Sequence, residues 1–310
     1  MTELPGSQLI ASVEAGGTKF VCAIGRGPGD IVAELRIPTT TPEETIERCL
    51  EFFSRQKTER GAVAALGVAT FGPAGLNPAR ADYGYITTTP KPGWQNVPLL
   101  GALQSGLGGI PARFDTDVNA AALAEWKWGA GKGVDSLLYY TIGTGIGGGF
   151  VSSRGAPLHG LVHPEMGHVR LPRDPARDPF TGACPFHGDC FEGLASGTAI
   201  EARWNQSATH IPPEHPAWDL EAEYIALALN NSVCSLSPER LVLGGGVMEQ
   251  QHLFPLIRLK LAQYLNGYID STMILEQIDQ YVVPPALANQ AGLLGGIALG
   301  QAALATLASA

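Results

Sequence analysis

The chain has 310 residues, of which 45% are hydrophobic, and a formal net charge of −9. This length and apolar content favour two domains, each with a core of its own. The acidic balance argues against a nucleic-acid surface, and no apolar run is long enough to cross a membrane. No secretory signal opens the sequence, so we expect a cytoplasmic protein with reduced cysteines.

The first half of the chain opens with strands and then alternates strands with helices. Strands are predicted at 9–13, 20–24 and 31–37, with a glycine hairpin between the first two. Thr41 is the predicted N-cap of a helix that starts at Pro42 and runs to about 56. The elements expected after it are a strand at 62–70, an irregular segment at 83–94, a helix from about 97, a strand at 111–115 and a helix at 120–128.

The second half repeats this opening. A strand at 136–142, a glycine turn at 143–149 and a return strand from 150–152 match the first hairpin. The elements expected after it are helices at about 196–204, 220–235 and 251–265, strands at 240–243 and 281–284, and a closing helix at about 291–307. We therefore predict two α/β lobes, 1–131 and 132–310, with a cleft between them. The closing helix could pack back on the N-terminal lobe.

A group of cysteines and histidines in the second half has the spacing of a metal site. Cys184, His187 and Cys190 follow a C-x2-H-x2-C pattern, and His168 upstream completes a set of four soft ligands. Four such ligands form the closed tetrahedral site typical of structural zinc. A Cys184–Cys190 disulfide and two unremarkable thiols are the alternatives, and a reducing compartment favours the metal.

The remaining cysteines lie in apolar segments, so we expect buried small hydrophobic side chains there. They are Cys22, Cys49 and Cys234.

Two glycine-rich loops, 16–19 and 143–149, follow predicted strands and could hold a polyphosphate through their backbone N–H groups. Taken singly, either loop is also typical of an ordinary hairpin turn. Neither has the Walker A pattern. The second has the letters of G-x-G-x-x-G but is followed by an apolar run, where a dinucleotide site needs a helix.

Asp117 lies where a strand is followed by a helix, and it is the candidate general base. A carboxylate there could accept a proton from a hydroxyl that attacks phosphorus. The alternative is that Asp117 only caps the helix.

Glu165, His168 and Glu192 flank the metal segment and could bind the hydroxyls of a polyol. If zinc holds one ring nitrogen of His168, the other nitrogen is free for a partner or ligand. The alternative for the two glutamates is surface charge or helix capping. A zinc-protease helix is not indicated, because the order from His163 to His168 does not fit H-E-x-x-H.

Several motifs across nearly the whole chain together resemble the ROK family (repressors, open reading frames and sugar kinases), and within it the fructokinase branch. They are EAGGTKFVCAIG at 14–25, FGPAGL at 71–76, TPKPGWQNVPLL at 89–100, DTDVNAAALAEWKWGAG at 115–131, TIGTGIGGG at 141–149, HPEMGH, CPFHGDCFEGLASG, and LGGGV at 243–247.

This resemblance implies a two-lobed, actin-like ATPase fold of the ribonuclease H-like type that closes over ATP, Mg²⁺ and a sugar. It implies transfer of phosphate from ATP to the 6-hydroxyl of D-fructose, with Asp117 as the base, and a homodimer. The implied ATP-binding and phosphate-binding residues are Gly16, Gly17, Thr18, Lys19, Thr144 and Gly145, with Gly244 and Gly245 near the adenosine. The implied sugar-binding residues are Asp117, Glu165, His168 and Glu192, and the implied zinc ligands are His168, Cys184, His187 and Cys190.

The chain departs from many family members at Glu14, at Thr116 and in the metal triplet. Glu14 and the triplet are similar to the fructokinase branch. Thr116 replaces an asparagine that would make one hexose contact, and the segment around Lys91 replaces an asparagine-bearing loop of glucokinase relatives, which makes glucose a less favoured substrate. A kinase for glucose, mannose or N-acetylmannosamine is the alternative activity. A sugar-responsive repressor is disfavoured, because only about eight residues precede the first predicted strand and a DNA-binding segment needs more.

Overall fold

The computed structural model describes residues 8–152 and 155–308. The chain forms two compact units, one built from 1–128, 156–164 and 289–310, the other from 129–155 and 165–288. Within the described residues, no helix is long and apolar enough to cross a membrane.

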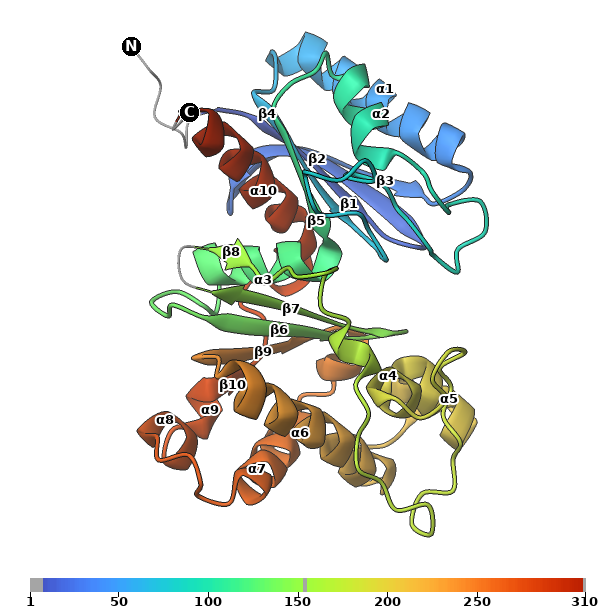
Figure 1. Ribbon diagram of the computed structural model, residues 1–310, viewed down its shortest axis with the longest axis vertical. Coiled ribbons are helices and arrows are strands. Elements are labelled where there is room, and N and C mark those ends of the chain that lie inside the picture. Colours follow the sequence, from blue (N-terminus) through green and yellow to red (C-terminus); the bar gives the residue numbers. More distant parts are fainter. Residues whose placement is uncertain (1–7, 153–154, 309–310) are drawn as a thin grey trace. The chain divides into compact units, whose positions relative to one another are not determined.

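The first unit is built on a mixed sheet with the strand order β3-β2-β1-β4-β5 (Figure 1). Its strands are β1 (Ile10–Ala15), β2 (Lys19–Gly27), β3 (Asp30–Pro38), β4 (Ala65–Thr70) and β5 (Ala112–Thr116). The first three pair antiparallel, whereas β1, β4 and β5 run parallel. The carboxyl ends of β1, β4 and β5 therefore meet at one edge of the sheet.

The helices of the first unit are α1 (Pro42–Arg60), α2 (Leu99–Gly106), α3 (Asp117–Trp128) and α10 (Ala291–Ala308), and a short strand, β8 (Ala156–Pro157), belongs to the same unit. Helix α1 starts as predicted, because the Thr41 side chain accepts the N–H of Glu44 at 3.3 Å. It continues to Arg60, past the predicted end. It stops at Gly61, whose φ of 93° is a backbone conformation that favours glycine.

Helix α10 packs closely on the sheet of the first unit. It contacts β1, β4 and α3, and Ser12 Oγ on β1 donates a hydrogen bond to the Leu293 carbonyl at 2.7 Å. A Cβ atom at Gly296 would collide with the Ser12 side chain, and one at Gly67 would collide with the Gly296 carbonyl. Glycine is required on both sides so that the helix backbone can reach the sheet.

The second unit has its own mixed sheet, with β10, β9, β6 and β7 in that order. Its strands are β6 (Leu137–Ile142), β7 (Ile146–Ser152), β9 (Arg240–Gly244) and β10 (Val282–Val283). Strands β6 and β7 are antiparallel, whereas β6 pairs parallel with β9 and β9 with β10. The last strand is shorter than predicted, because Tyr281 ends the short helix α9 (Ile278–Tyr281).

The predicted glycine turn at 143–149 is too long. Strand β7 starts at Ile146, so the later glycines of the run are paired with β6. A Cβ at Gly148 would lie 2.9 Å from both Met166 and Tyr140. These glycines therefore allow close packing inside the unit, and only 143–145 form the turn.

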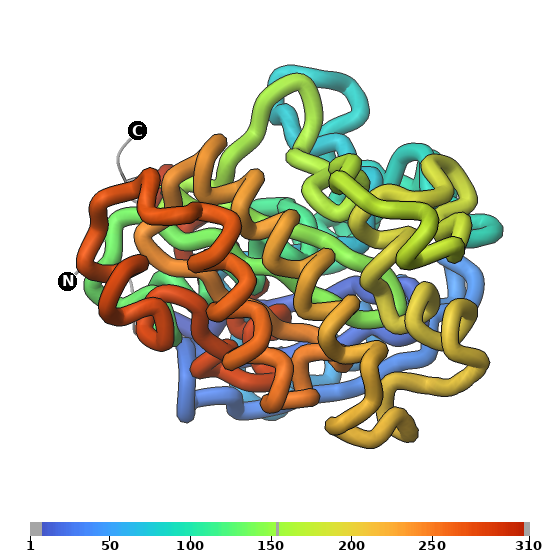
Figure 2. Tube along the Cα trace, turned by 90° about the horizontal axis from the view of Figure 1, so that it is seen from below, coloured from blue at the N-terminus to red at the C-terminus, as the bar shows by residue number. Residues whose placement is uncertain are grey.

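The remaining helices of the second unit are α4 (Phe191–Ala195), α5 (Gly197–Trp204), α6 (Ala217–Leu236), α7 (Leu253–Leu265) and α8 (Thr272–Leu275). Short 3-10 turns occur at Met166–His168, Ala208–His210, Gly246–Glu249 and Ala288–Gln290. Helices α6 and α7 lie side by side (Figures 1 and 2). Their inner faces form much of the core of this unit.

Two of the three cysteines outside the metal pattern are buried as predicted, namely Cys22 and Cys49. The prediction for Cys234 is wrong, because this residue is exposed on α6 next to the buried pair Ser232 and Val233. The apolar segment around it is one face of an amphipathic helix, and Cys234 lies on the other face.

Candidate functional site

The four predicted metal ligands come together in the second unit. His168 ends a 3-10 turn, Cys190 immediately precedes α4, and Cys184 and His187 lie on the loop between them. All four ligand atoms lie within 4.8 Å of one another. The hydrogen bonds between the backbones of Cys184 and Gly188, at 2.9 and 3.2 Å, fold the loop into a tight turn.

The donor set fits a tetrahedral zinc ion. The Nδ1 atom of His168 lies 3.8 Å from the Cys184 sulfur and 3.5 Å from the Cys190 sulfur, and His187 Nδ1 lies 3.7 Å from Cys184. A tetrahedron with metal–ligand bonds of about 2.0–2.3 Å has edges of about 3.3–3.8 Å. Burial raises the pKa of the Cys190 thiol to about 11, so its thiolate form needs a cation beside it.

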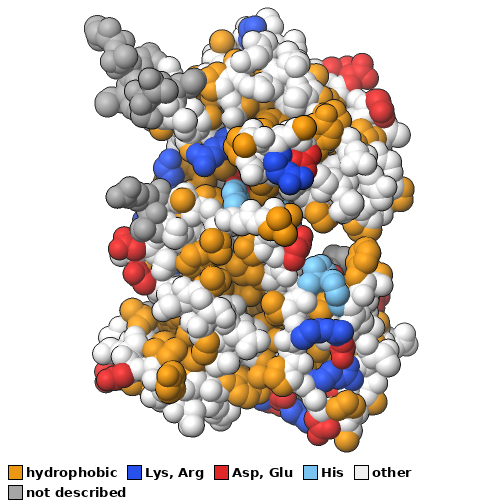
Figure 3. All heavy atoms as spheres, viewed as in Figure 1, with side chains coloured by type: hydrophobic (Ala, Val, Ile, Leu, Met, Phe, Trp, Pro, Cys, Tyr) orange, Lys and Arg blue, Asp and Glu red, His pale blue; other side chains and the backbone are white. Residues whose placement is uncertain are grey.

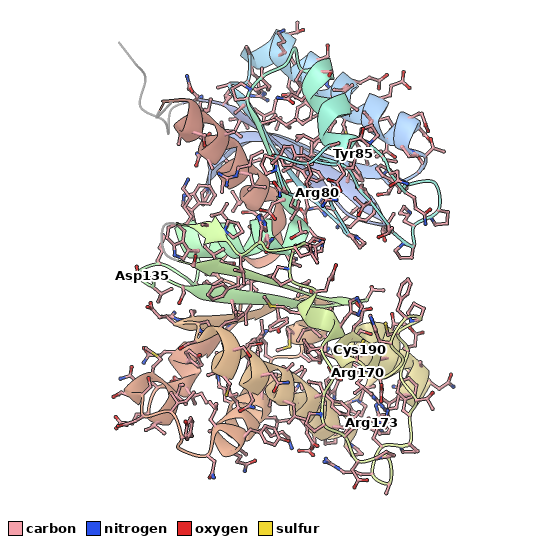
Figure 4. All side chains as sticks on the ribbon, in the orientation of Figure 1. Arg80, Tyr85, Asp135, Arg170, Arg173 and Cys190 are labelled. Atoms are coloured by element: carbon pink, nitrogen blue, oxygen red, sulfur yellow. The ribbon has the colours of Figure 1, made fainter. Side chains whose placement is uncertain are left out.

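Two arginines stabilise the loop at 184–190, called the metal loop below. Arg170 pairs with Asp189 and donates to the His187 carbonyl at 2.8 Å, and Arg173 reaches Asp189 at 3.4 Å. Figure 4 shows both arginines and Cys190 in one region of the second unit, and Figure 3 shows histidine, basic and acidic side chains gathered on its surface. The loop is therefore held by ion pairs as well as by the ligand cluster.

Asp117 opens α3 directly after β5, so the helix starts three residues earlier than predicted. Its carboxylate accepts the N–H of Val118 at 2.9 Å, and the Thr116 hydroxyl accepts the N–H of Asn119 at 3.2 Å. The capping bond of α3 is thus made by Thr116, the residue before the helix, and Asp117 lies in the first turn at the carboxyl edge of the sheet.

A network behind Asp117 was not predicted from the sequence. Asp115 is buried and accepts the N–H of Thr116 at 2.8 Å and the amide of Asn119 at 2.7 Å. His159 Nε2 lies 3.1 Å from the same carboxylate, and this hydrogen bond raises the pKa of His159. His159 has no motif around it that indicates a partner on β5.

The first glycine loop lies between β1 and β2 at the same sheet edge as Asp117. The N–H of Gly16 donates to the Lys19 carbonyl at 2.9 Å, and Gly17, Thr18 and Lys19 are exposed. Burial raises the pKa of the Glu14 carboxyl just before the loop, and nearby Lys19 partly offsets this.

The second glycine loop lies between β6 and β7, at the carboxyl end of β6. Its Gly143 N–H donates to the Gly145 carbonyl at 2.9 Å, and Thr144 is exposed. Strand β9 runs parallel to β6 and ends at Gly244, so Gly244 and Gly245 lie at the same edge of the second sheet. Each unit therefore has a glycine loop where ligands of open α/β sheets bind.

Glu192 contacts the second loop directly, since its carboxylate accepts the N–H of Ile146 at 2.9 Å. Partial burial raises the pKa of the Glu165 carboxyl, while His168 lowers it and Glu192 raises it further. The structure thus gathers Glu165, His168 and Glu192 around the metal segment of the second unit, and places Asp117 in the first unit.

Two α/β units, each with a mixed sheet and a glycine loop at the carboxyl edge, define the actin-like ATPase fold. The chain belongs to the ROK family, whose model matches residues 10–303. Both the predicted fold class and the predicted family are confirmed.

The chain is similar to several proteins of known name. It is 44% identical to a fructokinase of Pediococcus pentosaceus, over 96% of this chain and 99% of that protein. It is 41% identical to a fructokinase of Zymomonas mobilis, over 96% and 97% respectively. The crystal structure of a ROK hexokinase from Thermus thermophilus has a TM-score of 0.78 and 28% identity, and the match covers 96% of this chain and 99% of that one.

Proposed function

We propose that this protein transfers the γ-phosphoryl group of ATP to the 6-hydroxyl of D-fructose. The observation that carries this proposal is the position of Asp117, which lies at the sheet edge that also holds the first glycine loop. The fructokinases named above, which are similar over nearly their whole length, support fructose as the substrate.

In this proposal Asp117 accepts the proton of the attacking sugar hydroxyl, or orients that hydroxyl toward phosphorus. Its bond to the Val118 N–H, at 2.9 Å, helps to fix the orientation of the carboxylate. ATP enters as its Mg²⁺ complex, in which the cation neutralises phosphate charge. The loop residues Gly16 to Lys19 in one unit, and Thr144 and Gly145 in the other, supply N–H and hydroxyl donors for the phosphates, and Gly244 and Gly245 accommodate the adenosine.

Glu165, His168 and Glu192 are the proposed ligands of the sugar hydroxyls, together with Asp117. Their carboxylate oxygens accept hydrogen bonds from hydroxyls, and the His168 ring nitrogen that faces away from the cluster can serve as a further partner.

Zinc is the proposed metal of the cluster formed by His168, Cys184, His187 and Cys190. When bound, it would cross-link the loop and polarise no substrate, because four protein ligands leave no open position. Its role is to keep the segment from Glu165 to Glu192 in one conformation. The homodimer and the cytoplasmic location implied by the family are part of the same proposal, and light scattering of the purified protein tests the dimer.

The proposal is tested by ADP release with Mg²⁺ and fructose, glucose, mannose or N-acetylmannosamine. We expect a strong preference for fructose. Preferential turnover of another hexose would contradict fructose as the substrate but would support kinase activity. If zinc-replete protein phosphorylates none of the sugars, both the substrate and the kinase activity are contradicted.

The role of Asp117 has its own test in Asp117→Asn. This change keeps the cap on α3 but removes the basic oxygen, so kcat should fall by about 10²–10⁴-fold. Fructose binding, measured by calorimetry, should stay within a factor of about two or three of the unaltered protein, because the amide can still bond a hydroxyl. An Asn variant with full activity would rule out Asp117 as the base.

A further inference from the structure

The two glycine loops are braced in the same way, although they belong to different units. Thr39 Oγ1, just after β3, donates to the Gly16 carbonyl at 2.7 Å. Thr198 Oγ1, in the first turn of α5, donates to the Thr144 carbonyl at 2.8 Å. In each loop, a threonine hydroxyl from a segment distant in sequence holds one backbone carbonyl.

A held carbonyl determines the direction of an N–H group. The peptide unit is planar and trans, so the C=O of one residue and the N–H of the next point in opposite directions. Holding the Gly16 carbonyl therefore fixes the Gly17 N–H, and holding the Thr144 carbonyl fixes the Gly145 N–H. Both N–H groups point away from the bracing threonine.

The neighbouring bonds hold the rest of each loop independently of these hydroxyls. In the first loop, the N–H of Thr39 donates to the Thr18 carbonyl at 3.0 Å. In the second, the N–H of Gly197 donates to the Gly143 carbonyl at 2.6 Å, and Glu192 accepts the N–H of Ile146 at 2.9 Å. Removal of one hydroxyl should thus free a single peptide plane and leave the loop folded.

A freed peptide plane matters for an anion. If the plane turns over, it presents a carbonyl oxygen where it presented an N–H donor, and the local dipole then repels negative charge. Loops of small residues turn over readily, because glycine opposes neither orientation.

We propose that Thr39 and Thr198 are positioning residues for nucleotide phosphate. Each hydroxyl orients one N–H donor of its glycine loop toward the phosphates of Mg²⁺-ATP, and neither hydroxyl contacts the sugar. This inference rests on the proposed kinase function and assigns to these two threonines a specific part in ATP binding and phosphoryl transfer.

Valine and serine variants separate the hydroxyl from the shape of the side chain. Thr198→Val and Thr39→Val should each lower kcat/KM for ATP roughly tenfold, since displaced donors lose transition-state contacts. KM for fructose at saturating ATP should not change. Thr198→Ser and Thr39→Ser, which keep the hydroxyl, should restore kcat/KM to within about twofold of the unaltered protein.

The matched control is Thr58→Val on α1. The Thr58 hydroxyl also donates to a carbonyl, that of Ser54 at 3.3 Å, but it is exposed and belongs to neither loop. Its loss should leave both KM values and kcat unchanged. Equal losses in the serine and valine variants would overturn the proposal, as would a valine variant with unaltered ATP kinetics.

Direct nucleotide binding distinguishes failure of this inference from failure of the proposed function. Calorimetry with Mg²⁺ and a non-hydrolysable ATP analogue, without sugar, should give weaker binding for both valine variants than for the serine variants. If no sugar is phosphorylated but this order of affinities holds, the kinase proposal fails and the positioning role stands. Equal affinities, or no nucleotide binding by the unaltered protein, would overturn the positioning role.

Discussion

One carboxylate outside the site lies buried without full compensation, namely Glu221 on α6. It is 2% exposed, and its Oε1 has no hydrogen-bond partner among the described residues. Burial raises the pKa of Glu221 well above its usual range, and the nearby Arg203, already paired with Asp178 at 3.2 Å, only partly offsets this. Folding therefore shifts this carboxyl toward its protonated form relative to the unfolded chain.

This burial predicts a stability that falls as the pH rises. The carboxyl titrates at a higher pH in the folded chain than in the unfolded chain, so its proton stabilises the fold at low pH. That contribution is lost between the unfolded pKa of about 4.3 and the raised folded pKa. Glu221→Gln removes this titration. In urea unfolding at pH 5 and pH 8, the free energy of unfolding of the variant should therefore rise relative to that of the unaltered protein as the pH rises.

Glu201→Gln on α5 is the control, because Glu201 is exposed. Its unfolding free energy should follow that of the unaltered protein at both pH values. If the difference in unfolding free energy between Glu221→Gln and the unaltered protein is the same at pH 5 and pH 8, Glu221 is not the source of this pH dependence.

Residues within a short motif could be predicted, and residues paired over long distances could not. The spacing of Cys184, His187 and Cys190 indicated a cluster because all three lie on one loop. The pairing of His159 with Asp115, and of Thr198 with Thr144, depends on how the chain folds back. No local pattern of residue types records such a contact.

Among the elements, α10 depends most on close backbone contact. Gly296→Ala would place a methyl group against Ser12, so we expect a loss of about 1–3 kcal/mol in the free energy of unfolding. Gly101→Ala on α2 is the matched control, because a Cβ there meets no atom within 4 Å. That change should instead stabilise the protein by about 0.5–1 kcal/mol, since alanine favours helix. Urea unfolding of both variants measures these changes in the free energy of unfolding. Changes of the same sign and size in the two variants would contradict the packing argument.

The metal loop is the element in which the ligand cluster and ion pairs act together. Purified protein should contain about one zinc ion per chain. Its removal by a chelator should lower the unfolding temperature and speed proteolysis between Cys184 and Cys190, because each ligand otherwise fixes part of the loop. Cys190→Ala should lose the zinc, whereas Cys234→Ala, at an exposed cysteine outside the cluster, should retain it. Metal-free protein with unchanged unfolding and proteolysis would contradict the structural role.

The types of the main elements followed from local signals, and their ends depended on tertiary contacts. Thr41 and Pro42 predicted the start of α1 correctly, because a cap is a local feature. The start of β7 at Ile146 was missed, since glycines look like a turn until their packing against Met166 is known. The start of α3 at Asp117 was missed because one residue, Thr116, both ends β5 and caps the helix.

At the level of the whole molecule, the predicted two-lobed α/β class is confirmed, because both halves repeat a strand, a glycine loop and an antiparallel return strand. The repetition predicted where each glycine loop lies in its sheet. It did not predict the short helix α4 or the short strand β8, whose sequences carry no periodic pattern.

The first unit also has an order of assembly, because its sheet is covered by α10 from the far end of the chain. During synthesis, β1 to β5 leave the ribosome long before 291–308 do. Residues 129–288, by contrast, include both segments that form the second unit. The second unit can therefore finish folding before α10 leaves the ribosome, and the first unit reaches its final core only after α10 has emerged.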